Sequence, residues 1–234
     1  TKEGAIETKI DFPDLSDYAR RFEEAHPKAD EKYQDLVHKI SALRDLPLAD
    51  LSSANLKPIF SALSVAMAIR NYKVRVPVPT NVEELLRLIW KVAHLENLPG
   101  RGQPIQSAAR ELFGGLISLQ GFDVSVASSI FHFLWPDHFP MMDTYTGRSA
   151  KALLREHADL FPGELNLPSG TPSSKAAKET KVSQYSDFKR AVDRIIELQK
   201  ALRGIPENKP IQEGVSDYRY VDKCLTAMAE EGGK

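Results

Sequence analysis

Apolar residues recur every three or four positions through most of the chain, whereas the alternation typical of a half-buried strand is nearly absent. Spacing of this kind places apolar side chains on one face of an α-helix. The pattern predicts an all-α fold, with helices near residues 15–22, 33–43, 56–69, 81–95, 108–117, 124–134, 144–157 and 188–202 and a last helix that starts at Ser216 or Asp217.

The segments between the helices carry residues that stop or start a helix. Two prolines exclude helix from residues 73–79, and Asn81 with Glu84 has the spacing of a capping box for the next helix. The stretch 99–104, PGRGQP, lacks the lysine and hydroxyl residue of a phosphate-binding P-loop, and we interpret it as a turn. Residues 159–182, rich in Pro, Ser, Gly and Lys, predict a long surface loop.

The most informative stretch is residues 119–150, LQGFDVSVASSIFHFLWPDHFPMMDTYTGRSA. Gly121 lies between the helical patterns 108–117 and 124–134, which predicts a helix, a tight hairpin and a second helix. A loop bounded by prolines follows, and Asp143 then opens the next helical pattern. An acidic residue at this position is typical of a helix N-cap.

This segment resembles the helix-hairpin-helix of the DNA glycosylase superfamily. In that family the hairpin binds a DNA phosphate through backbone N–H groups, and an aspartate at the start of the following helix assists cleavage of the bond between base and sugar. The resemblance implies that Gly121, Phe122, Val124 and Ser125 form the DNA-binding hairpin and that Asp143 is the catalytic carboxylate. It also implies a two-lobed helical fold with a cleft between the lobes.

Two positions depart from the pattern of the family. Its hairpins usually hold two glycines that flank one apolar residue, but here Asp123 follows Gly121 and Phe122, and its charge would oppose a phosphate. Family members that also nick the strand have a lysine where this chain has Ser125. A lyase reaction through an amine is therefore not expected, and a catalytic protein would be monofunctional.

The residues of this stretch also have purely structural interpretations. Asp143 is equally well explained as an N-cap that satisfies free N–H groups of the next helix. Trp135, His138 and Tyr145 are candidates to line a pocket for a flipped base, although aromatic residues between helices more often close a core. For Phe139 we favour core packing.

The charge of the chain argues against strong non-specific DNA binding, because phosphate neutralisation supplies most of that affinity. The formal net charge is −1 and the sequence pI is near 6.6. The hairpin stretch is itself not cationic, so a basic face must come from elsewhere. The two candidate clusters are Arg70, Lys73 and Arg75, and Lys175, Lys178 and Lys181, both of which also fit an ordinary solvated surface.

No cofactor or metal is expected. Cys224 is the single cysteine, which excludes an intrachain disulfide and the four-cysteine iron–sulfur cluster that some glycosylases of the superfamily carry. The six histidines have no Cys or His partners at zinc-site spacing, so we interpret them as core or solvated residues.

We expect one all-α unit over residues 1–234, divided into two lobes. Residues 81–158 would form the helix-hairpin-helix lobe, residues 1–80 and 183–234 the second lobe, and residues 159–182 the loop between them. Asp143 would lie at the mouth of the cleft. The sequence leaves the oligomeric state open.

The sequence thus leads to two functional hypotheses, and a plain helical protein with an unrelated function remains as a third. The first is a protein that binds duplex DNA and acts as a monofunctional glycosylase with Asp143 as its carboxylate. The second is a non-catalytic binding module with the same fold, in which Asp143 is only a cap. No apolar run is long enough to cross a bilayer, and residues 1–14 lack the apolar core of a signal peptide, so we expect a cytoplasmic protein without a membrane partner.

Overall fold

The computed structural model describes residues 10–50, 82–161, 163–168 and 176–232. Within these ranges the chain forms α-helices and short 3-10 turns, and its only β pairing is one isolated bridge between Gln212 and Val215. The prediction of an all-α fold is confirmed for this part of the chain. The predicted helix at 56–69, the extended segment 73–79 and Asn81 lie outside the described residues.

The described helices agree closely with the hydrophobic pattern, with one exception. The α-helices are α1 (Ser16–Ala25), α2 (Ala29–Ser41), α4 (Val82–Ala93), α5 (Ser107–Leu116), α6 (Val124–Leu134), α7 (Thr144–Glu156), α8 (Lys178–Leu202) and α9 (Asp217–Gly232). Short 3-10 helices occur at η1 (Ala42–Asp45), η2 (Leu48–Asp50) and η3 (Ala158–Leu160). Every predicted helix that falls within the described ranges is present.

The exception is α8, which begins ten residues before the predicted helix. It takes in residues 178–182 of the segment that the sequence predicted to be loop. Val182 and Tyr185 are buried and continue the apolar face toward the start of the helix. The Tyr185 ring stacks on Phe113 of α5, with ring centroids 4.2 Å apart. Packing against α5 thus stabilises a first turn whose own sequence is almost wholly polar.

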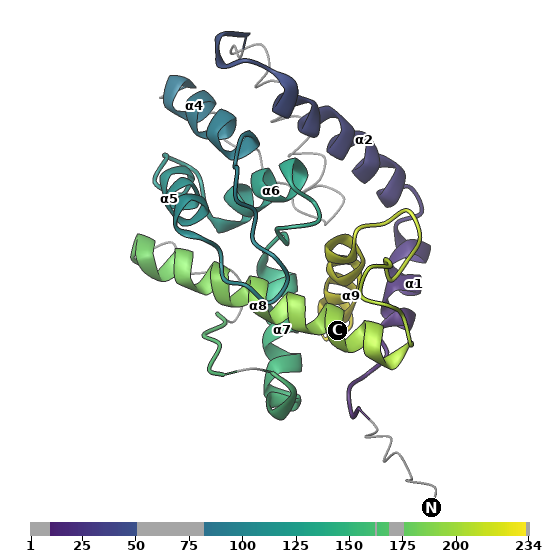
Figure 1. The fold of residues 1–234 in the computed structure, drawn as a ribbon. Coiled ribbons are helices and arrows are strands. Elements are labelled where there is room, and N and C mark those ends of the chain that lie inside the picture. The colour runs from purple at the N-terminus through teal and green to yellow at the C-terminus, as the bar shows by residue number, and fades with distance from the viewer. Residues whose placement is uncertain (1–9, 51–81, 162, 169–175, 233–234) are drawn as a thin grey trace, which may run out of the picture.

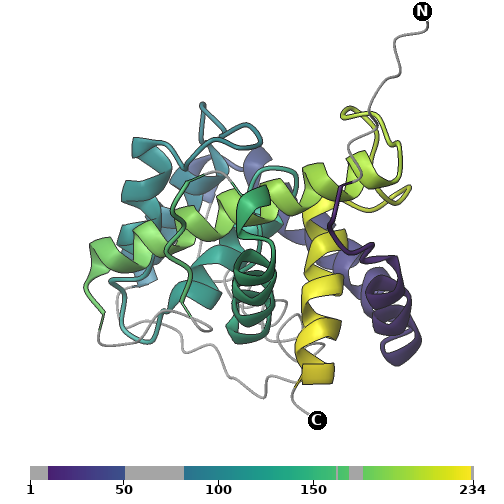
Figure 2. The same ribbon diagram turned by 90° about the horizontal axis from the view of Figure 1, so that it is seen from below.

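Helix α8 crosses the molecule and, among the described helices, packs on α5, α7 and α9 (Figure 1). Its first half packs on α5, and further along it meets α7 and α9. α9 in turn lies between α1 and α7, as Figure 2 shows from a second direction. α4, α5 and α6 pack together, and α2 covers α6.

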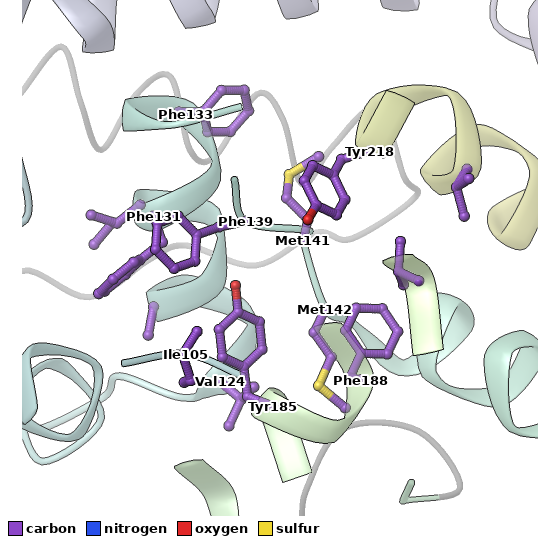
Figure 3. Packing of buried hydrophobic residues seen from close by; sticks show 14 of the residues in the cluster. Ile105, Val124, Phe131, Phe133, Phe139, Met141, Met142, Tyr185, Phe188 and Tyr218 are labelled. Carbon is purple, nitrogen blue, oxygen red and sulfur yellow. The ribbon is translucent and has the colours of Figure 1, made fainter. Parts of the chain in front are cut away.

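The centre of the core lies under the loop between α6 and α7. Phe131 of α6, Phe139 of the loop and Phe188 of α8 are all almost fully buried. Figure 3 shows Met141 and Met142 of the same loop among these rings, together with Tyr185. Phe139 is therefore a core residue, as the sequence predicted. The apolar side chains just before Asp143 fix the loop to the core.

None of the described helices is both long and apolar enough to cross a membrane.

Candidate functional site

The hairpin between α5 and α6 has the predicted glycine turn. Gly121 has φ of +80°, a left-handed conformation that glycine adopts without strain. The amide of Phe122 donates a hydrogen bond to the Leu119 carbonyl at 3.0 Å and so closes the turn. Phe122 and Val124 are buried, whereas Ser125 is half-buried. The side chains of Phe122 and Val124 thus hold the hairpin on the core.

Asp123 occupies the position where the resemblance would place a second glycine, and it caps α6. Its backbone is extended, and its Oδ1 accepts the backbone N–H of Val126 at 3.0 Å. The residue is exposed. The Asp123 carboxylate therefore already accepts a hydrogen bond from one of the N–H groups that could otherwise bind an anion at the start of α6.

Asp143 begins α7 in the same way. The backbone N–H of Thr146 donates to Asp143 Oδ1 at 2.8 Å, and the Asp143 N–H donates to Thr146 Oγ1 at 2.9 Å, which makes a reciprocal capping box. Only 4% of Asp143 is exposed. The N-cap predicted from the sequence is present. A cap of this kind fixes the direction in which the carboxylate points.

Polar side chains of α6 and α8 anchor the loop that leads to Asp143. The Met142 amide donates to Ser128 Oγ of α6 at 3.0 Å. His132, also on α6, lies with Nδ1 2.7 Å from the Phe139 carbonyl oxygen. The second ring nitrogen of His132, Nε2, lies 2.6 Å from the Tyr33 hydroxyl of α2. The Tyr185 hydroxyl of α8 donates to the Pro140 carbonyl at 3.0 Å.

These anchors determine where Asp143 lies relative to the hairpin. Ser128 is on the helix that begins at the hairpin, and its hydroxyl bonds to the residue directly before Asp143. The hairpin and the carboxylate are therefore attached to one rigid element, α6. His132 contributes as a core histidine, which was one of the two roles that the sequence left open.

The three pocket candidates do not form one group. Trp135 Nε1 donates to the Val92 carbonyl of α4 at 2.7 Å, and the guanidinium carbon of Arg44 lies 4.8 Å from the centre of a Trp135 ring. His138 lies edge-on to Trp135, with centroids 6.4 Å apart, and its Nδ1 is 3.2 Å from the Pro99 carbonyl oxygen. Tyr145 is half-buried in the first turn of α7. Trp135 and His138 thus face α4 and the 99–104 loop.

The 99–104 loop is held by a buried ion pair that the sequence analysis missed. Lys189 Nζ of α8 donates to the carbonyls of Gly100 at 3.0 Å and Gln103 at 3.2 Å, and lies 2.7 Å from Asp193 Oδ2. Both charged side chains are fully buried. The Gly102 amide, with φ of +69°, donates to the same carboxylate at 2.9 Å. The loop is a turn, as predicted, and α8 determines its shape.

Burial governs the protonation of this cluster. It raises the pKa of the Asp193 carboxyl and of the Tyr218 hydroxyl, which donates to Asp193 Oδ1, and it lowers the pKa of the Lys189 ammonium. The ion pair and the hydrogen bonds oppose the shifts of Asp193 and Lys189, whereas the charge of Asp193 and its hydrogen bond raise the pKa of Tyr218 further. Because carbonyls and a carboxylate surround the ammonium, the cluster is saturated with protein partners and serves as a structural clamp.

A second buried lysine lies farther along α8. Lys200 Nζ is 2.7 Å from Asp217 Oδ2 and donates to the carbonyls of Glu207 and Lys209. Arg101 of the first loop also pairs with Asp217, so the two loops are linked. A surface cavity of about 420 Å³ lies over this group. Its lining carries three cationic and three acidic residues, Arg101, Lys200, Lys209, Asp137, Glu207 and Asp217, and shows no preference for one charge.

The basic clusters predicted from the sequence are only partly described. Arg70, Lys73, Arg75 and Lys175 lie outside the described residues. Lys178 is exposed in the first turn of α8 and lies against α5 at Gly114, close to the hairpin. No three acidic, histidine or cysteine side chains come together as a metal site in the part of the chain that is described.

The chain matches no protein-family model, no curated protein and no solved structure.

Proposed function

We propose that this protein binds duplex DNA through the hairpin at residues 117–123 and that Asp143 assists the cleavage of an N-glycosidic bond. One observation carries the proposal: α6 starts at the hairpin and also holds, through Ser128, the residue directly before Asp143. A hairpin on the DNA backbone would then set the position of the carboxylate relative to the same strand.

The proposed chemistry needs little from Asp143 except a fixed negative charge. As the bond between C1′ and the base nitrogen breaks, its electrons leave with the base and positive charge develops on the sugar. A carboxylate beside C1′ stabilises that charge, water then adds to C1′ and loses a proton, and the departed base takes up a proton. The capping box restricts the side chain to one orientation, which lowers the cost of aligning it. Ser125 offers no amine for strand cleavage.

A second candidate function is a non-catalytic module with the same fold. Two observations favour it. Asp123 Oδ1 accepts an N–H of the α6 start, and Asp143 caps α7 and is almost fully buried. In this case both aspartates serve only to start helices, and the hairpin contacts a partner other than a DNA phosphate.

Binding by fluorescence anisotropy tests the DNA hypothesis. Duplexes with and without an abasic-site analogue are compared at low and moderate salt, with Gly121→Ala as the variant. Gly204→Ala is a matched control because Gly204 also has positive φ, +63°, and has open space around it. We expect salt-sensitive binding that prefers the lesion and that Gly121→Ala weakens more than Gly204→Ala. The absence of binding at low salt would rule out DNA as the partner.

Release of free bases separates the two functions. DNA that has been alkylated, oxidised or deaminated is incubated with the protein, and the released bases are measured by mass spectrometry. Asp143→Asn keeps an oxygen for the Thr146 N–H but removes the charge, and Asp123→Asn makes the same change at the neighbouring cap. Catalysis predicts that only Asp143→Asn abolishes release. A wild type that binds DNA but releases no base would contradict the catalytic role of Asp143.

A further inference from the structure

The side chain of Lys178 crosses α5 at a glycine. A Cβ on Gly114 would lie 2.5 Å from Lys178 Cε and 3.3 Å from its Nζ, closer than carbon atoms approach without a shift. The absence of a side chain on Gly114 is thus what allows the ammonium to lie against the helix. The Gly114 carbonyl accepts a hydrogen bond from Ser118 Oγ at 2.7 Å, and Ser118 is already part of the hairpin.

A second cation shares this face of α5. Arg110 precedes Gly114 by four residues, one helical turn, so its side chain projects on the same side. It is half-buried, whereas Lys178 is exposed. Glu111, the next residue, lines a cavity of about 520 Å³ with Lys91 of α4 and with His94, which directly follows α4.

Neither cation is neutralised within the described part of the chain. Neither side chain forms a hydrogen bond or an ion pair with another described residue. Two exposed cations on other helices are paired: Lys39 with Asp35 at 2.6 Å and Arg87 with Glu84 at 2.5 Å. Two unpaired cations on one face attract an anion and gain from its binding, since they repel each other in its absence.

We propose that Arg110 and Lys178 bind a backbone phosphate of duplex DNA beside the hairpin at residues 117–123. This inference rests on the proposed DNA binding and names the residues that supply its charge. Gly114 lies in the last turn of α5, seven residues before Gly121, so Lys178 lies near the end of the helix pair that the hairpin closes. Arg110 lies one helical turn farther from the hairpin on α5. They compensate for Asp123, whose carboxylate lies at the start of α6.

The two side chains suit different parts of this task. The planar Arg110 guanidinium can donate two parallel hydrogen bonds to one phosphate. The Lys178 ammonium acts as a point charge on a flexible stem, so it follows the phosphate as the DNA moves. Contacts of this kind set the position of the protein on the duplex and carry no base information.

The salt dependence of DNA binding tests the inference. The affinity of wild type, Arg110→Gln, Lys178→Gln and Lys178→Arg is measured at four salt concentrations with intact and abasic duplexes. Lys32→Gln is the control, because Lys32 is an exposed lysine on α2, which lies across the molecule from α5 (Figure 1). Circular dichroism checks that each variant is folded.

Removing a cation that neutralises one phosphate should make the slope of log K against log salt shallower by about 0.9. We expect this change for Arg110→Gln and for Lys178→Gln on both duplexes, the wild-type slope for Lys178→Arg, and no change for Lys32→Gln. Slopes of Arg110→Gln and Lys178→Gln that equal the control would overturn the inference and leave DNA binding intact. A loss of affinity confined to the abasic duplex would also overturn it, since a contact to a phosphate does not depend on the base. A wild type that does not bind DNA removes both proposals.

Discussion

Lys189 and Lys200 hold two separate loops of the protein in the same manner. Both lie on α8, both ammonium groups are buried, and each binds two backbone carbonyls and one carboxylate. The partners are Gly100, Gln103 and Asp193 for the first lysine and Glu207, Lys209 and Asp217 for the second. One face of α8 thus determines the course of the chain before α5 and before α9.

The first prediction concerns Lys189→Met. The substitution leaves the Asp193 carboxylate buried without its cation and two carbonyls without their donor. We expect the free energy of unfolding to fall by about 3–5 kcal/mol, the usual cost of removing one partner of a buried pair. Urea denaturation measures it. Lys39→Met breaks the exposed pair with Asp35 and should cost about 1 kcal/mol or less. Equal losses would show that Lys189 is not a structural clamp.

The second prediction concerns the ionic network between α1, α2 and α9. Lys223 Nζ lies 2.6 Å from Glu23 Oε1 and 2.8 Å from Asp30 Oδ2, and Arg219 also binds Asp30. Burial alone would raise the pKa of both carboxyls, but the hydrogen bonds and charge of Lys223, joined at Asp30 by Arg219, outweigh it. The pKa of Glu23 and that of Asp30 therefore lie below their ordinary values of 4.5 and 3.8.

A carboxyl group whose pKa is lowered in the folded protein stabilises the fold at pH values above its ordinary pKa. This stabilisation is lost as the pH falls through the pKa of the folded state. We therefore expect the free energy of unfolding to decrease as the pH is lowered from about 5 to about 2. Asp30→Asn removes one of the two carboxyls, so the variant should lose less stability over this range. Urea denaturation at a series of pH values measures both. A variant as acid-sensitive as the wild type would exclude Asp30 as a source of the dependence.

The third prediction compares two adjacent glycines of α5. Gly114→Ala displaces only the end of the flexible Lys178 side chain and should stabilise the protein by up to about 1 kcal/mol through helix propensity. Gly115→Ala would place a Cβ 2.9 Å from Leu88 Cδ2, in the core between α4 and α5, and should cost about 1–3 kcal/mol. Thermal or urea denaturation should therefore shift in opposite directions for the two variants. If both variants shifted the unfolding transition in the same direction, the result would contradict the packing that the structure shows around one of the two glycines.

The fourth prediction concerns the loop before Asp143. His132→Phe removes the partner of the Phe139 carbonyl and of the Tyr33 hydroxyl, both buried. We expect faster hydrogen exchange at the amides of Met142 and Asp143, measured by mass spectrometry, and a loss of about 1–3 kcal/mol in stability. Tyr33→Phe keeps the bond to Phe139 and should leave the exchange at these two amides close to wild type.

Local chemistry explains which elements could be predicted. The bounds of α6 follow from its apolar residues, and its first residue follows from Gly121 and Asp123 just before it. The cap at Asp143 could be predicted from the sequence because Asp143 and its partner Thr146 are only three residues apart. The start of α8 could not be predicted, because its first turn is polar and is stabilised by α5, about 65 residues earlier in the chain.

The clamp could not be predicted for a related reason. Lys189 bonds to carbonyls 89 and 86 residues away, and a lysine in a helical pattern is ordinarily placed on the solvent face. One signal was present. Lys189 and Asp193 are four residues apart on the face of α8 that also carries Tyr185, Val192 and Ile196, which are apolar and buried. An oppositely charged pair at this spacing on an apolar face indicates a buried pair.

The packing of α1 on α9 has a consequence for the order in which the chain folds. The Cys224 thiol of α9 lies 3.4 Å from the Leu15 carbonyl oxygen, although the two residues are 209 positions apart. During synthesis α1 therefore leaves the ribosome long before its partner exists, and Phe22 and Ala19 have no surface to cover them. Contacts at such separation form slowly. This half of the molecule can be completed only after α9 has been made, and until then the apolar face of α1 is open to chaperones.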